Sequence, residues 1–406
     1  MTAEIVVMNK NGVALAADSA VTVGGRKVYN SANKLFTLSK HHPVGILIYG
    51  SATFNDIPWE IIIKEYREQL KENSFDSLEK YEKHFQEFLS RPCWKSSTIV
   101  QSQHARNMLL EFADFFHEQY VANNSHKQTS SYTKAVFDRT VTAVEKILQD
   151  CTDKYIYTNV KEYELESSLQ HVFQKCGITT SYEYIQKIVE LFLRALRGNY
   201  SFFHKSGIAI AGYGKKDIYP ALTSFETSGF ICNHLRMFEK NPEKITDKNG
   251  SAVCPLAQRD MSDLFMSGIH PDYKIFISSQ LKPLLETLGE EMISLKKPQD
   301  QGVSIRAAFK NTYKDLIQGI DSFSYKRFIE PKINSVGTLS KIELAKMAES
   351  LVELQAFGQQ VSLDVETVGG PIDVAVISKH DGFVWLKRKL YFKPELNHCF
   401  FEKYLK

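Results

Sequence analysis

The stretch NGVALAADSAVT, residues 11–22, determines how the chain begins to fold. Its first two residues, Asn-Gly, are a strong two-residue hairpin signal, and they separate the apolar runs 5–8 and 13–17. The two runs are therefore expected to pair as antiparallel strands. Asp18 directly follows the second run, and a charge at the end of an apolar strand is unexpected unless it has a partner.

Strand and helix patterns follow this hairpin in long blocks. We expect further strands at residues 34–38, 44–49, 207–211, 218–225, 372–378 and 383–387. Helical periodicity fills residues 58–200 and 255–358, and we expect the second block to break near 268–272, 298–302 and 331–337. Blocks of this kind predict an α+β fold with mainly antiparallel strands covered by helices.

Composition places few limits on function. The chain has 406 residues, 43% hydrophobic and 24% charged, with a formal net charge of +3. Such a balance gives no electrostatic reason to expect a nucleic-acid or membrane partner. No apolar run is long enough to cross a bilayer, the start lacks a secretory pattern, and the six cysteines form no CxxC pair. We therefore expect a cytoplasmic protein, and no ligand spacing predicts a metal site.

The second residue is the first candidate for chemistry. Thr2 follows Met1, and a small second residue generally permits removal of the initiator methionine. The exposed threonine would carry a hydroxyl nucleophile and, in its own α-amine, a base with a pKa near neutrality. Lys34 beside it would lower the pKa values of both groups, and a carboxylate such as Asp18 would hold that lysine charged.

Thr2, Asp18, Thr22 and Lys34 resemble the proteasome β-type motif in residue type and spacing. The surrounding words NGVALAADSAVT, SANKLF and GILIYGSA are similar too, as are residues 206–229 and 367–389 later in the chain. The chain thus resembles the N-terminal-nucleophile (Ntn) hydrolases. That resemblance implies a four-layer αββα sandwich, with residues 1–57 and 201–406 as the core with long C-terminal helices and residues 58–200 as a helical insertion.

The resemblance also implies roles for individual residues. Thr2 would be the nucleophile of a peptidase that forms an acyl-enzyme, Lys34 would tune it, and Asp18 would support the lysine. The backbone N–H of Tyr49 or Gly50 would form the oxyanion hole, and the sequence leaves both open. Thr22 would bind substrate backbone, and an apolar pocket for the preceding side chain would be lined by Val21, Ala32, Phe36, Leu47 and Ser51.

One departure from the family pattern keeps other functions open. Where the family usually has an aspartate and a serine before paired glycines, this chain has Val365 and Val368 before Gly369-Gly370. The alternatives are a catalytically inactive scaffold or binding subunit and an amidase for a small molecule. Members of the family usually form rings and work with an ATP-dependent unfoldase, so the resemblance implies a peptide or protein substrate, a homo-oligomer and such a partner. It implies no cofactor.

Overall fold

The computed structural model describes residues 3–23, 27–39, 41–124, 131–150, 162–176, 178, 180–198, 203, 205–295, 301–362 and 368–399. Thr2 lies outside these residues, and so do residues 364–367 before the paired glycines. None of the described helices is both long enough and apolar enough to span a bilayer.

Strands and helices follow one another in the predicted blocks. The strands are β1 (Glu4–Asn9), β2 (Gly12–Ala17), β3 (Val21–Val23), β4 (Lys27–Tyr29), β5 (Leu35–Thr37), β6 (Val44–Gly50), β7 (Thr53–Phe54), β8 (Ile57–Pro58), β9 (Ser206–Gly212), β10 (Ala221–Ile231), β11 (His234–Glu239), β12 (Glu243–Lys244), β13 (Ser251–Pro255), β14 (Asp373–Ser378) and β15 (Gly382–Lys387). The α-helices are α1 (Trp59–Leu70), α2 (Leu78–Leu89), α3 (Thr98–Ala122), α4 (Lys134–Ile147), α5 (Glu162–Lys175), α6 (Tyr182–Arg197), α7 (Asp260–Ser267), α8 (Pro271–Leu295), α9 (Gln301–Ser324), α10 (Glu330–Val336) and α11 (Lys341–Gln360).

Two antiparallel sheets form the centre of the protein. The first has the order β13-β1-β2-β14-β15 and the second the order β11-β10-β9-β6-β5. The hairpin predicted at the Asn-Gly turn is confirmed, because β1 pairs with β2 in a register that places Asn9 opposite Gly12. The α+β class and the antiparallel pairing are confirmed as well.

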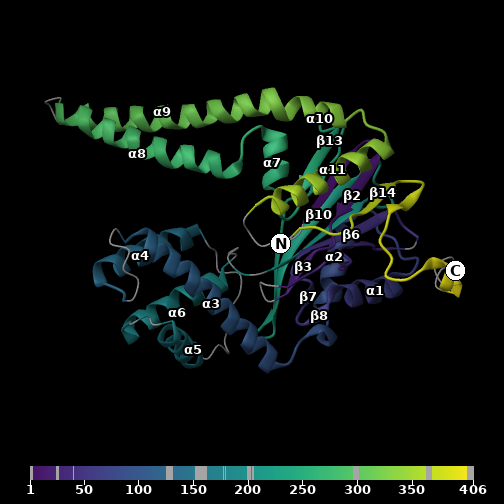
Figure 1. Ribbon diagram of the computed structural model, residues 1–406, viewed down its shortest axis with the longest axis horizontal. Coiled ribbons are helices and arrows are strands. Elements are labelled where there is room, and N and C mark those ends of the chain that lie inside the picture. The colour runs from purple at the N-terminus through teal and green to yellow at the C-terminus, as the bar shows by residue number, and fades with distance from the viewer. Residues whose placement is uncertain are drawn as a thin grey trace.

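The core residues show how the layers stack. Alternate side chains of β1, β2, β6 and β9 form one apolar cluster between the two sheets. The opposite face of the first sheet packs against α10 and α11, and the opposite face of the second packs against α1 and α2. The order is therefore helix, sheet, sheet, helix, and Figure 1 shows α11 and α1 on opposite sides of the strands.

The remaining helices before β9 have a core of their own. Apolar side chains of α3, α4, α5 and α6 gather in one cluster, which reaches the sheets at Ile231 of β10. These four helices occupy one end of the molecule in Figure 1, beside the sheets rather than over them. Helices α1 and α2 differ from them, because they pack on the second sheet.

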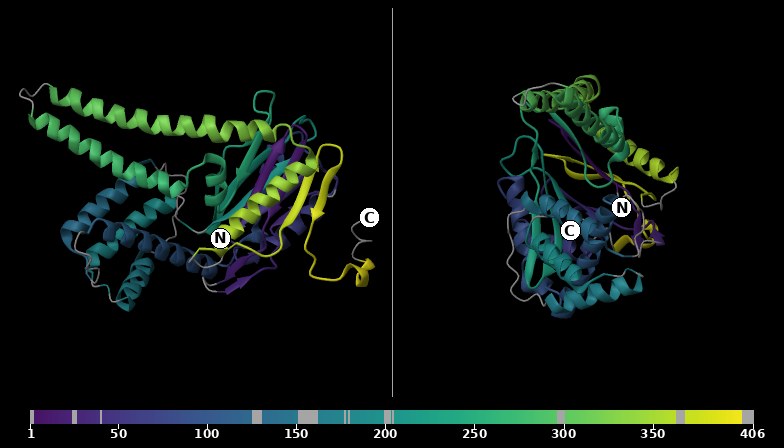
Figure 2. Two further views of the ribbon diagram at one scale, coloured as in Figure 1. Left: turned by 45° about the horizontal axis from the view of Figure 1, so that its top comes forward. Right: turned by 90° about the vertical axis from the view of Figure 1, so that its left-hand side faces the viewer.

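Helices α8 and α9 form a long antiparallel pair that extends beyond the sheets (Figures 1 and 2). The break predicted near residues 268–272 is confirmed, since α7 ends at Ser267 and α8 begins at Pro271. The break predicted near 331–337 falls after Val336 rather than at Pro331. A π-helical turn, Tyr325–Ile329, joins α9 to α10 without a break directly before this proline. Because a proline within a helix removes a backbone hydrogen bond, a local irregularity of this kind lets the helix continue past Pro331.

Candidate active site

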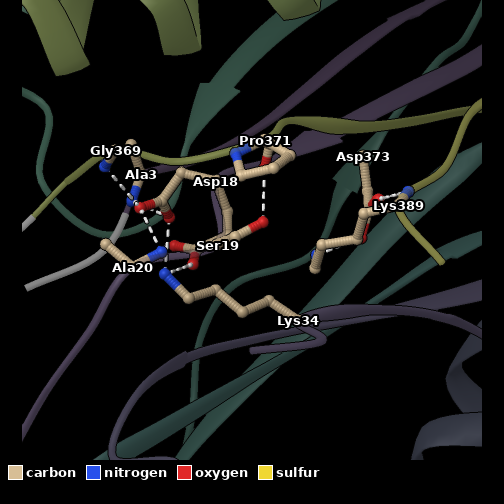
Figure 3. A network of polar contacts seen from close by, with 10 residues as sticks. Ala3, Asp18, Ser19, Ala20, Lys34, Gly369, Pro371, Asp373 and Lys389 are labelled. Carbon is tan, nitrogen blue, oxygen red and sulfur yellow. Dashed lines mark hydrogen bonds and ion pairs between the residues drawn. The ribbon is translucent and has the colours of Figure 1, made fainter. Parts of the chain in front are cut away.

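Asp18 lies at the end of β2, buried between four hydrogen-bond donors (Figure 3). Its Oδ1 accepts from the backbone N–H of Ala3 at 3.0 Å and from the Lys34 ammonium at 2.5 Å. Its Oδ2 accepts from the N–H of Ala20 at 3.2 Å and of Gly369 at 3.0 Å. A buried carboxylate needs both a counter-charge and donors for its lone pairs, and Asp18 has both.

Lys34 stands directly before β5, with only 4% of its surface exposed. Its ammonium therefore reaches Asp18 from the second sheet, while Asp18 belongs to the first. The pair joins the two sheets at one end of the strands. The structure thus brings together two of the three residues for which the sequence predicts a catalytic role, and Thr2 lies outside the described residues.

A second carboxylate, Glu4, lies near the same lysine. Glu4 is fully buried at the start of β1, and its Oε1 is 3.8 Å from the Lys34 Nζ. No role was predicted for Glu4 from the sequence. The signal was present, because a carboxylate at the head of an apolar strand needs a polar partner as much as Asp18 does.

The paired glycines reach this site from the far end of the sequence. Gly369 donates to Asp18, and its carbonyl accepts from the N–H of Ser19 at 3.1 Å. Gly370 has φ +76, and a Cβ there would lie 2.7 Å from the Cβ of Asn30. Both the backbone conformation and the close approach therefore require glycine. Val368 is buried against the helix side of the first sheet.

The two candidates for the oxyanion hole, the backbone N–H groups of Tyr49 and Gly50, point to opposite sides of β6. Ile48 donates its backbone N–H to the carbonyl of Lys34 at 2.9 Å, whereas Ser51 donates to the carbonyl of Lys205, next to β9, at 3.1 Å. Successive N–H groups of a strand point to opposite sides. The N–H of Gly50 therefore points toward the side of Lys34, and that of Tyr49 points toward β9.

Glycine is also the residue that fits at this turn. Gly50 has φ +79, and a Cβ there would lie 2.2 Å from the Lys205 carbonyl oxygen. The side chain of Tyr49 enters the space between the sheets, where its hydroxyl accepts from the Lys240 ammonium at 3.2 Å. Burial raises the pKa of the Tyr49 hydroxyl, so the group stays neutral.

A pocket of about 160 Å³ opens beside Lys34 and Gly50. Of the predicted pocket residues, Val21, Ala32 and Ser51 line it. Its other lining residues are Asn33, Ile48, Tyr49, Ala52, Pro58, Trp59 and Glu60.

Two predicted lining residues, Phe36 and Leu47, do not line this pocket. Phe36 packs among the side chains of α1 and α2, and Leu47 packs between the sheets. The two residues face opposite sides of the second sheet, and the pocket lies at its end. The backbone of Thr22 pairs with Val28 in the β3–β4 hairpin, which places it in the chain segment that follows Asp18.

Among the described residues, no three His, Cys, Asp or Glu side chains gather closely enough to hold a metal ion.

Comparison with known proteins gives only distant similarity. No protein-family model matches the chain, and no curated protein matches it in sequence. Among solved structures, Anbu from Hyphomicrobium sp. strain MC1 aligns with 99% of this chain and 94% of its own, at 8% identity and a TM-score of 0.29. A Gly-1 mutant of that protein gives the same coverage and identity at a TM-score of 0.28. Anbu from Yersinia bercovieri, described as an ancestral beta-subunit, covers 99% and 95% at 9% identity and a TM-score of 0.25. This similarity assigns no activity or site residue to the present chain.

Proposed function

We propose that this protein is an N-terminal threonine hydrolase that cleaves amide bonds of peptides, with Thr2 as the nucleophile once Met1 is removed. The observation that carries the proposal is the position of Asp18 Oδ1, which accepts from both the Lys34 ammonium and the N–H of Ala3. Ala3 is the residue next to Thr2. One carboxylate oxygen therefore ties the chain beside the nucleophile to the lysine that would tune it.

The other groups that the reaction needs would lie at the same end of the two sheets as Asp18. The Lys34 ammonium would favour the deprotonated states of the threonine hydroxyl and α-amine. The amine would accept the proton of the hydroxyl as it attacks the substrate carbonyl. The N–H of Gly50 would stabilise the oxyanion, because it points toward the side of Lys34. The intermediate would then collapse with cleavage of the substrate C–N bond, and the protonated α-amine would give its proton to the leaving amine. Water would hydrolyse the acyl-enzyme ester that remains on Thr2, which releases the carboxylic acid and restores the threonine hydroxyl. In this proposal the helix–sheet–sheet–helix layers are the αββα sandwich of the Ntn hydrolases.

Intact mass spectrometry before and after treatment with a peptide epoxyketone tests the proposal. We expect a mass lacking one methionine residue and a single adduct that maps to Thr2. The Thr2→Ala variant should still lose Met1, because alanine is also small, and should form no adduct. Lys34→Met should form the adduct much more slowly, with circular dichroism used to verify that it folds.

Retained Met1 together with no adduct would overturn the proposal. That outcome would favour a non-catalytic binding protein with the same fold. An adduct without hydrolysis of any peptide, but with hydrolysis of small amides, would move the substrate from peptides to small molecules.

A further inference from the structure

The pocket beside Lys34 has a carboxylate among its apolar walls. Val21, Ala32, Ile48, Pro58 and Trp59 supply most of the apolar lining.

Glu60, in the first turn of α1, lines the same pocket, and 37% of its side chain is exposed. The amide of Asn33, another lining residue, donates to Glu60 Oε2 at 3.3 Å. Asn33 thus fixes the orientation of the carboxylate from within the pocket.

Lys34 is the other charged residue of the lining, and its charge is compensated. Its ammonium is held by Asp18 at 2.5 Å and has Glu4 at 3.8 Å. The pocket lining and the partners of Lys34 thus include three carboxylates, those of Glu4, Asp18 and Glu60, and Lys34 is the one lysine that lines the pocket. A positively charged group entering the pocket meets attraction from Glu60 without an opposing free cation among the lining residues.

Lys64 competes for Glu60 from outside. Its ammonium pairs with Glu60 Oε1 one helical turn away, but 48% of its side chain is exposed and it does not line the pocket. Exposed pairs of this spacing are weak, because solvent screens them and both side chains lose rotamer freedom. A cation within the pocket can therefore share or take over the carboxylate.

We propose that this pocket binds the side chain of a lysine or arginine that precedes the cleaved bond. Such a side chain has an aliphatic stem that suits apolar walls and a cationic end that suits Glu60. The inference rests on the proposed function, because Lys34 and Gly50 mark the pocket mouth as the place of the scissile carbonyl. It differs from the apolar preference that the family resemblance implies.

Fluorogenic peptide amides that differ only in the residue before the cleaved bond test this specificity. With arginine, lysine, norleucine and glutamate at that position, we expect kcat/KM to be at least about tenfold higher for the two basic residues than for norleucine. The ratio of arginine to norleucine should fall about tenfold in Glu60→Gln. It should stay as in the native protein in Glu65→Gln, an exposed carboxylate of the same helix that does not line the pocket. It should rise in Lys64→Gln.

A binding measurement separates failure of the inference from failure of the chemistry. N-acetyl-arginine amide and N-acetyl-norleucine amide are compared by ligand-observed NMR on the Thr2→Ala protein, which does not depend on turnover. Tighter binding of the arginine amide that disappears in Glu60→Gln supports the inference even if no peptide is cleaved. Equal binding of the two amides, or an arginine preference that Glu60→Gln leaves intact, overturns it, whether or not the protein hydrolyses peptides.

Discussion

The two faces of strand β10 each border a carboxylate, one buried and one partly buried, and the pKa values of these groups are shifted in opposite directions. On the face covered by helices, Glu82 of α2 is only 8% exposed. Burial, together with the negative charge of Glu239, raises the pKa of Glu82 to about 7. On the face toward the first sheet, Glu226 of β10 lies 2.7 Å from the Lys240 ammonium and 3.2 Å from that of Lys205.

Burial alone would raise the pKa of Glu226 as well, yet the two lysines hold it below its ordinary value. Burial therefore does not by itself decide whether a carboxylate keeps its charge, because a cation within hydrogen-bond distance can outweigh it. Asp18 of the candidate site likewise has a lysine ammonium within hydrogen-bond distance, that of Lys34.

The Asp18→Asn substitution is expected to have the largest effect. Removing one member of a buried pair leaves the Lys34 ammonium without its closest counter-charge and turns an amide N–H₂ toward a backbone donor. We expect a loss of about 3–5 kcal/mol in the free energy of unfolding, measured by urea denaturation at pH 7. Asp56→Asn provides the control, because Asp56 is exposed in a turn with φ +66, which asparagine tolerates. Equal stability of the two variants would contradict the comparison.

Glu226→Gln is expected to be milder, because the Lys240 side chain is 45% exposed and retains solvent. We expect a loss of about 2–3 kcal/mol at pH 7, below the fully buried case. The pKa of Glu226 is lowered in the folded state, so its contribution is present above the ordinary glutamate value and is lost as the pH falls through the folded-state value. The difference between native and variant should therefore disappear in acid.

A double-mutant cycle of Glu226→Gln with Lys240→Gln measures the pairwise part of this effect. A coupling energy near zero would mean that the lysine does not stabilise the carboxylate.

The sequence predicted those parts of the fold that have a local signal. The Asn-Gly turn fixed the first hairpin, and a charge at the end of an apolar strand pointed to Asp18. The sequence could not show which donors surround that carboxylate. Gly369, for example, lies 351 positions further along the chain and reaches Asp18 only because β14 pairs with β2.

The residues that line the pocket could likewise be predicted only in part, because some of them depend on long-range packing. Resemblance indicated Val21, Ala32 and Ser51, which do line it, together with Phe36 and Leu47, which the sheet directs elsewhere. Glu60 was not predicted as a pocket residue, because an acidic residue in the first turn of a helix is already explained by its favourable interaction with the helix dipole. Its position beside Asn33 depends on how α1 packs against the sheet.

Glu82→Gln should give the smallest effect of the three and should have the opposite sign. In the folded protein Glu82 keeps its proton up to a pKa of about 7, whereas in the unfolded chain it loses it near 4.5. The folded state then binds more protons between these values, so stability falls as the pH rises through that window. Glutamine cannot ionise, and the variant should be more stable than the native protein by about 1–2 kcal/mol at pH 8, after allowance for residual solvent.

At pH 4 the native protein and Glu82→Gln should have nearly equal free energies of unfolding, because Glu82 is then mostly protonated in the folded and in the unfolded chain. Urea denaturation across this pH range gives the curve, with Glu87→Gln, an exposed carboxylate of the same helix, as the control. If Glu82→Gln instead destabilised the protein at pH 8, burial would not be what sets the pKa of Glu82. The contrast with Glu226, which two lysines contact directly, would then fail.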